Sequence, residues 1–125
     1  MHWAETFVGI PYAENDCAQF AARVQREVFG KHITLPSQRA AGYRGQSAQL
    51  VNLRDDYATP TDDPIDGDAV LMVGRGYLNH IGVFARIDSE PWVLHAMRNA
   101  GHVVLHRVRD LPRYGLTLEG YYRWR

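Results

Sequence analysis

The chain has 125 residues, enough for one compact domain over residues 1–125 and too few for two ordinary ones. Hydrophobic residues make up 46% of it, which excludes a disordered segment, and its 14 basic and 14 acidic residues balance, which argues against nucleic-acid binding. No apolar run approaches the ~20 residues that span a bilayer, and the N-terminus lacks the basic and apolar regions of a signal peptide, so we expect no membrane partner.

The first half of the chain predicts helices. Residues 1–12 fit a short helix or an extended lead-in. Asp16 suits an N-cap, and Gln19 follows at the capping-box spacing, which predicts a helix over residues 16–29. The apolar stripe of this helix should face the core; it comprises Cys17, Phe20, Ala21, Val24 and Val28.

The middle of the chain is less regular. Pro36 and Ser37 predict the start of a second helix through Gln38–Tyr43, and Gln46–Leu53 fits another turn or two. Residues 59–68 are rich in Thr, Pro and Asp, which predicts a loop.

The second half predicts strands, because runs rich in Val, Ile, Leu and aromatic residues alternate with turn formers. These runs are Ala69–Val73, His80–Ile87, Trp92–Ala96, His102–Val108 and Gly120–Trp124. The sequence therefore predicts an α+β fold in which helices pack on one side of a mostly antiparallel sheet of about five strands.

The single cysteine, Cys17, falls at the first position of the predicted helix. Unsatisfied N–H groups and the helix dipole at that position favour a thiolate, which is a strong nucleophile toward an acyl carbon. The same N–H groups can stabilise the oxyanion that follows attack. A lone cysteine can also be an inert, buried apolar residue, so this choice depends on its partners.

Two histidines are candidate partners. His80 shares a strand face with Gly82, where the backbone can be approached closely, and Ile81 and Val83 on the opposite face suit the core. His95 lies on the next predicted strand and can sit beside His80 in a hairpin, where it would orient the imidazole. Taken singly, each also fits an ordinary hydrogen-bonded histidine.

Three runs in order resemble the motifs of the NlpC/P60 cysteine peptidases. The first is Gly9-Ile10-Pro11-Tyr12 followed by Asp16-Cys17-Ala18-Gln19, the second Gly67-Asp68-Ala69 followed by His80-Ile81-Gly82-Val83, and the third Val93-Leu94-His95-Ala96. The phage and prophage branch is most similar, with Trp3 near the start and Gly120-Tyr121-Tyr122-Arg123 at the end. Ala18-Gln19 departs from the usual Ser-Gly, and the segment between Tyr12 and Asp16 is short.

The resemblance implies a papain-like catalytic domain that needs no cofactor. It implies Cys17 as nucleophile, His80 as base, His95 as orienting residue and Tyr12 in the oxyanion region. The implied substrate is a bacterial peptidoglycan peptide, cleaved between D-glutamate and a diamino acid. The implied route from the cytoplasm to the cell wall is delivery with phage tail proteins or another form of export.

Two other functions stay open. Proteins with related folds include lipid acyltransferases. The reaction can therefore be acyl transfer or amide hydrolysis on a substrate other than peptidoglycan. The chain can also serve in phage tail assembly with an idle site. A metal site is not predicted, because His102 and His106 would lie roughly 13 Å apart along a strand and the chain has no second cysteine.

Overall fold

The computed structural model describes residues 2–35, 40 and 42–125. In chain order, the elements are the 3-10 helix η1 (Trp3–Phe7), the helices α1 (Cys17–Val28) and α2 (Gly42–Tyr57), the strands β1 (Ala58–Thr61), β2 (Ala69–Gly74), β3 (Tyr77–Ile87), β4 (Glu90–Met97) and β5 (His102–Arg107), the 3-10 helix η2 (Val108–Tyr114) and the strand β6 (Thr117–Trp124).

The strands in this part of the chain form one six-stranded sheet in the order β1-β6-β2-β3-β4-β5. Each neighbouring pair is antiparallel. The predicted α+β class and antiparallel sheet are thus confirmed, but the expected number of five strands is wrong.

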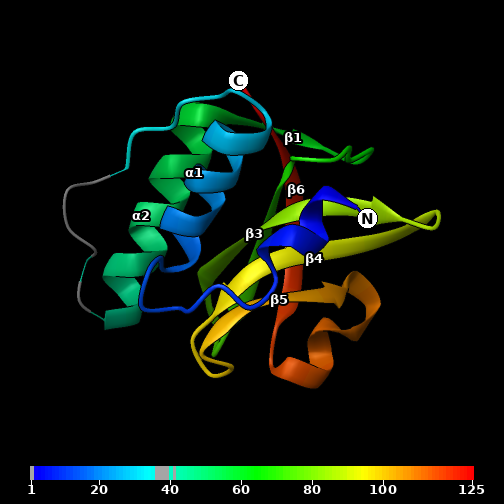
Figure 1. Ribbon diagram of the computed structural model, residues 1–125. Helices are drawn as coiled ribbons and strands as arrows, with labels where there is room; N and C mark the ends of the chain where they lie inside the picture. Colours follow the sequence, from blue (N-terminus) through cyan, green and yellow to red (C-terminus); the bar gives the residue numbers. More distant parts are fainter. Residues whose placement is uncertain (1, 36–39, 41) are drawn as a thin grey trace.

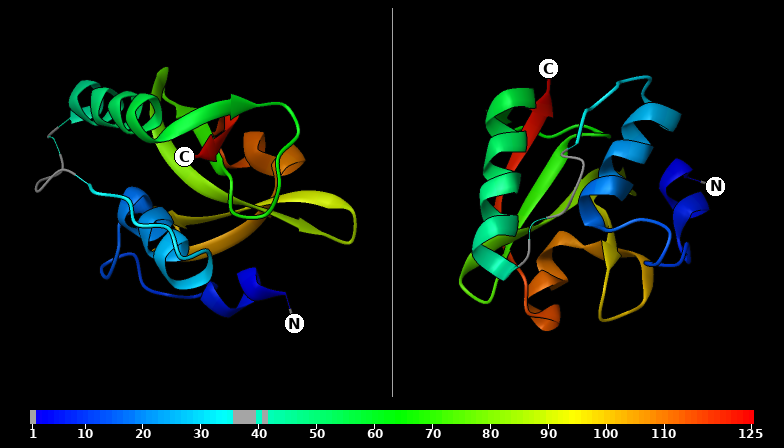
Figure 2. Two further views of the ribbon diagram at one scale, coloured as in Figure 1. Left: turned by 90° about the horizontal axis from the view of Figure 1, so that it is seen from above. Right: turned by 90° about the vertical axis from the view of Figure 1, so that its left-hand side faces the viewer.

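Both faces of the sheet are covered. Helices α1 and α2 pack on one face, α1 against β3 and β4, and α2 against β3 and β1 (Figure 1). The main core lies between these helices and the sheet. It includes Ile81, Val83 and Ala85 of β3, as the alternation of residues along that strand predicted. A smaller core lies where η2 covers the opposite face, around Phe84 and Leu111 (Figure 2).

Helix α1 begins where the sequence predicted. The Asp16 carboxylate accepts the backbone N–H of Gln19 at 2.9 Å, and the Gln19 side chain accepts the N–H of Asp16 at 3.0 Å. This capping box makes Cys17 the first helical residue. The helix ends at Val28, one residue before the predicted boundary, and Phe29 is its C-cap.

Helix α2 is longer than the sequence indicated. One helix runs over Gly42–Tyr57, where we expected only a turn or two in Gln46–Leu53. Leu50 and Leu53 are its buried apolar residues, and so sparse an apolar stripe gives a weak periodic signal. Residues 38, 39 and 41 of the helix predicted at Gln38–Tyr43 lie outside the described residues, and its last two residues belong to α2.

The predicted loop at residues 59–68 is wrong in its first part. Residues 58–61 form β1, which pairs with the final strand, β6. Pro60 favoured a loop because proline cannot donate to a sheet ladder. β1 lies at the edge of the sheet, where that missing donor is tolerated.

Several other boundaries differ from the predicted ones. β3 begins at Tyr77 rather than His80, because a tight turn at Arg75 and Gly76 starts the strand earlier. β5 stops at Arg107, since Val108 begins η2. Residues 1–12, apart from the undescribed first residue, contain the short helix η1 and an extended stretch beyond it.

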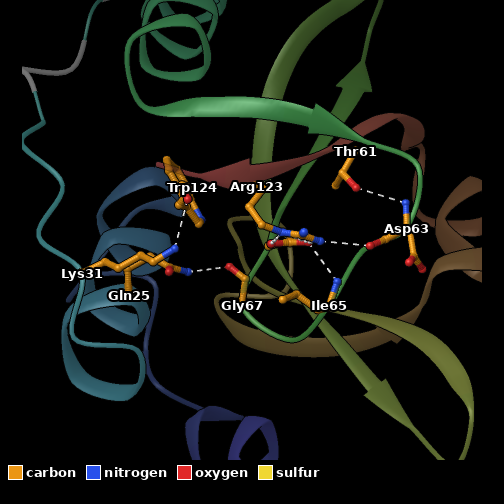
Figure 3. A network of polar contacts seen from close by, with 9 residues as sticks. Gln25, Lys31, Thr61, Asp63, Ile65, Gly67, Arg123 and Trp124 are labelled. Atoms are coloured by element: carbon orange, nitrogen blue, oxygen red, sulfur yellow. Dashed lines mark hydrogen bonds and ion pairs between the residues drawn. The ribbon is translucent and has the colours of Figure 1, made fainter.

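The Gly67-Asp68 pair, directly before β2, contacts both α1 and β6 (Figure 3). The buried Gln25 side chain donates to the Gly67 carbonyl oxygen at 2.7 Å. Gly67 has φ of +97°, and a Cβ there would lie 2.8 Å from the Phe29 ring, so only glycine fits. Asp68, 4% exposed, accepts from the Arg123 guanidinium at 2.9 Å. The pair therefore has a structural role.

Candidate active site

Cys17 lies at the N-terminus of α1. Its residue is 4% exposed and belongs to the main core. Cys17 is the first residue of the helix, at the end where unsatisfied backbone N–H groups carry a partial positive charge. Helix α1 packs against β3 and β4, the two strands that carry His80 and His95.

His80 and His95 are hydrogen-bonded to one another. His80 Nε2 lies 2.7 Å from His95 Nδ1, and the two rings meet edge to face. The pairing of β3 with β4 ends at Val83 and Leu94, so both histidines lie beyond the last paired residues. Their side chains connect the two strands at this point. The prediction that His95 lies beside His80 is confirmed.

Gly82 allows this close approach of β4. A Cβ added at Gly82 would lie 2.5 Å from Val93 Cγ2, 3.0 Å from the Leu94 carbonyl oxygen and 3.1 Å from His95 Cβ. Atoms at such distances overlap, so any larger residue would push β4 and His95 away. The sequence had indicated a closely approached backbone at this glycine, and that prediction is confirmed.

His95 is fully buried and contacts a third histidine. Its residue is 0% exposed, and its Nε2 lies 3.1 Å from His106 Nδ1 on β5. Burial lowers the pKa of His95 well below its usual 6.5, and the nearby His80 and His106 lower it further. His95 is therefore neutral at physiological pH, with one ring nitrogen as donor and the other as acceptor.

His106 was not predicted at this site, because its sequence pattern was interpreted only as a possible metal ligand beside His102. In the structure, Val104 lies opposite His95, and His106 is its diagonal neighbour. Diagonal side chains two residues apart can touch when they are long. Knowledge of the register of the β4–β5 hairpin would have predicted that His106 lies beside His95. His102 instead contacts the Ala100 carbonyl oxygen at 3.1 Å.

Tyr12 reaches the site through backbone pairing. Gly9 N–H donates to the Val103 carbonyl, Val103 N–H to the Ile10 carbonyl, and Tyr12 N–H to the Gly101 carbonyl at 2.9 Å. The stretch of residues 9–12 thus runs along the outer side of β5. This pairing holds Tyr12 at the end of the β4–β5 hairpin.

A cleft of about 530 Å³ lies beside Tyr12 and His80, and its described lining residues include neither Cys17 nor His95. Tyr12 and His80 both line it, as do residues of α2, of the two hairpin turns and of the segment after η2. The remaining lining residues are Gly42, Gln46, Gly74, Arg75, Asn79, Met97, Arg98, Asn99, Tyr114, Gly115 and Leu116. Arg75 and Arg98 carry positive charge, and the described lining residues include no carboxylate. The cleft therefore suits an anionic ligand.

Comparisons of the chain with protein-family models, with curated proteins and with solved structures find no match. Among the described residues, no group of three or more His, Cys, Asp or Glu side chains surrounds a point where a metal ion would bind. No helix in the same part of the chain combines the length and the apolar character needed to cross a membrane.

Proposed function

We propose that the protein is a cysteine peptidase with a papain-like fold of the NlpC/P60 type, acting on peptidoglycan stem peptides. One observation carries the proposal: a hydrogen-bonded His80–His95 pair on a cleft that Tyr12 also lines. A helix that starts at a cysteine packs on the same two strands. A nucleophile, a base and an orienting residue are the parts that acyl transfer to a thiol needs.

The first half of the reaction forms an acyl-enzyme. His80 takes the proton of the Cys17 thiol, and the sulfur attacks the carbonyl carbon of the scissile amide. The backbone N–H groups of the first turn of α1, together with the Tyr12 hydroxyl, stabilise the oxyanion. The carbon–nitrogen bond then breaks, and His80 gives its proton to the leaving amine.

The second half releases the acyl group. Water attacks the thioester, and His80 takes a proton from that water. The carbon–sulfur bond breaks, which gives a carboxylic acid and returns the thiol and the neutral imidazole. The reaction needs no metal or cofactor at either step.

The charge of the cleft supports the choice of substrate. Stem peptides with D-glutamate and diamino acid residues carry carboxylates, and two arginines from different hairpin turns line the cleft. Arginine recognises a carboxylate through paired hydrogen bonds.

Alkylation of Cys17 by iodoacetamide across pH tests the mechanism without a substrate. We expect reactivity to persist well below neutral pH in the wild type and to shift toward the free-thiol value of about 8.5 in His80→Ala. A wild-type profile near that value, unchanged in His80→Ala, would contradict the peptidase and favour a structural role.

Measurement of peptidoglycan cleavage then identifies the molecule that accepts the acyl group. Cys17→Ala is expected to abolish the release of new amine ends from purified peptidoglycan, because no other thiol is present. The measurement is mass spectrometry of the soluble fragments. Full activity in Cys17→Ala would refute the assignment of Cys17 as the nucleophile. Acyl transfer to an amine or lipid without hydrolysis would refute peptidoglycan as the substrate.

A further inference from the structure

His106 continues the hydrogen-bonded chain beyond the two histidines of the proposed site. Its Nδ1 lies 3.1 Å from His95 Nε2, and His95 Nδ1 lies 2.7 Å from His80 Nε2. Building on the proposed function, we propose that His106 is a positioning residue: as a neutral ring it accepts the Nε2–H of His95 and thereby makes His80 Nδ1 the basic nitrogen.

The direction of these hydrogen bonds follows from proton counting. A neutral imidazole has one donor and one acceptor nitrogen. If His106 Nδ1 accepts, His95 carries its proton on Nε2 and its Nδ1 accepts. His80 must then donate from Nε2. The other nitrogen of His80, Nδ1, is left without a proton and can act as a base.

The opposite direction removes the base. If His106 donated from Nδ1, His95 would accept at Nε2 and donate from Nδ1. His80 would then accept at Nε2, and its proton would remain on Nδ1. This arrangement also opposes an imidazolium on His80, because two N–H groups would face each other across 2.7 Å. The state of His106 therefore selects between an active and an inactive His80.

The surroundings of His106 favour its neutral form, the state in which Nδ1 can accept. Its ring stacks on Tyr114 of η2, with centroids 3.8 Å apart and planes at 5°. Burial lowers the pKa of His106, and Asp110 on the same helix partly opposes this. Arg113 lies 4.0 Å from the Asp110 carboxylate, which weakens the influence of that charge. On β4, the neighbour is the neutral His95.

The stack also links His106 to the cleft. Tyr114 lines the same cleft as His80, while its ring covers His106. His80 thus contacts His95, His95 contacts His106, and His106 contacts Tyr114. The first and the last of these four residues line the cleft. The ring of Tyr114 holds the plane of His106, and this plane determines where Nδ1 points.

Two substitutions separate hydrogen bonding from shape. His106→Phe keeps a flat ring against Tyr114 but has no acceptor. His106→Asn loses the ring, yet its side-chain oxygen branches at the same position as Nδ1 and can accept from His95. The readouts are the pH profile of Cys17 alkylation by iodoacetamide and the turnover of peptidoglycan, with circular dichroism to check that each variant is folded.

The expected result is a split between the variants. In His106→Phe, the alkylation profile should shift toward the free-thiol value and kcat/KM should fall by about tenfold or more with KM little changed. His106→Asn should keep most of the wild-type profile. An unchanged profile in folded His106→Phe would overturn the proposal, and so would an equal shift in both variants, since shape alone would then explain it.

Nitrogen-15 NMR of the histidine rings tests the proposal independently of Cys17. We expect protonated Nε2 and unprotonated Nδ1 on His95 and His106 in the wild type at pH 7.5. A protonated Nδ1 on His106 would overturn it. If the wild-type alkylation profile is that of an ordinary thiol, the proposed peptidase fails, and the ring protonation still decides the direction of the histidine chain.

Discussion

Gly82 shows how a residue without a side chain determines the geometry of the site. A Cβ at this position would meet Val93, Leu94 and His95 at 2.5–3.1 Å. We expect Gly82→Ala to lower the free energy of unfolding by about 1–3 kcal/mol, the usual cost of an overpacked core. It should also separate His80 from His95 and reduce kcat/KM, which urea unfolding and turnover would measure.

Gly120→Ala on β6 is the matched control for Gly82→Ala. The three atoms nearest to a Cβ there all belong to the Tyr122 side chain, at 3.3–3.6 Å. This side chain can move slightly, so we expect a smaller loss of stability and an unchanged alkylation profile at Cys17. Equal effects of the two substitutions on that profile would show that close approach at Gly82 does not position the histidines.

The sequence predicted some residues of the site and missed one. The capping box of Asp16 and Gln19 is a local signal, and it placed Cys17 at the helix start. The spacing of two strands was enough to bring His80 and His95 together. His106 required the register of the β4–β5 hairpin, which depends on the turn between the strands and has no marker in a single sequence.

At the scale of elements, a buried polar contact adds to the apolar packing that attaches helix α1 to the sheet. Gln25 is 1% exposed and donates to the Gly67 carbonyl at 2.7 Å (Figure 3). We expect Gln25→Leu, which keeps the size of the side chain, to lower the free energy of unfolding by about 1–3 kcal/mol, because it leaves that carbonyl buried without a donor. Urea unfolding measures this change.

The control for Gln25→Leu is Arg26→Leu on the exposed side of the same helix. Surface substitutions of this kind usually change stability by less than about 0.5 kcal/mol. A loss in Gln25→Leu no larger than in Arg26→Leu would show that the contact with Gly67 adds little to the attachment of α1.

Elements with strong local signals were predicted more accurately than those that depend on tertiary contacts. The apolar stripe of α1 as far as Val24 and the Val-rich central strands were recognised, because their periodicity is clear. Val28, predicted to face the core as well, is 37% exposed, because it is the last residue of the helix. α2 has few buried residues and was recognised only in part. β1 was missed because Pro60 reads as a loop residue unless the strand is known to be at an edge.

For the whole molecule, the buried His95 predicts a loss of stability in acid. The pKa of His95 is lowered well below 6.5 in the folded protein, so the unfolded chain takes up its proton first. Stability from this residue is complete above about pH 6.5 and falls as the pH drops below it, by at most about 1.4 kcal/mol per pH unit. His106 adds a slope of the same sign.

Urea unfolding between pH 7.5 and 5 measures that slope. His95→Asn is expected to be less stable at pH 7.5 and to show a flatter dependence on pH, because asparagine does not titrate in this range. His32→Asn, at an exposed position, is the control and should retain the wild-type slope. An unchanged slope in His95→Asn would contradict the assignment of acid sensitivity to His95.

The covering of both faces of the sheet was the least predictable feature of the whole molecule. The sequence predicted helices on one side only, yet Leu111 of η2 packs with Phe84 on the other. This short 3-10 helix contains Pro112 and has no regular apolar period, so it gave no helical signal. It also carries Tyr114, which completes the cleft.

The pairing of residues 9–12 with β5 has a consequence for the kinetics of folding. Tyr12 and Cys17 lie near the start of the chain, whereas Gly101 and Val103, which hold this stretch, lie near its other end. Contacts between such distant residues close a long loop and form slowly compared with local helices. During refolding, α1 should therefore form before Tyr12 reaches the cleft, and this side of the cleft should be assembled among the last parts of the molecule.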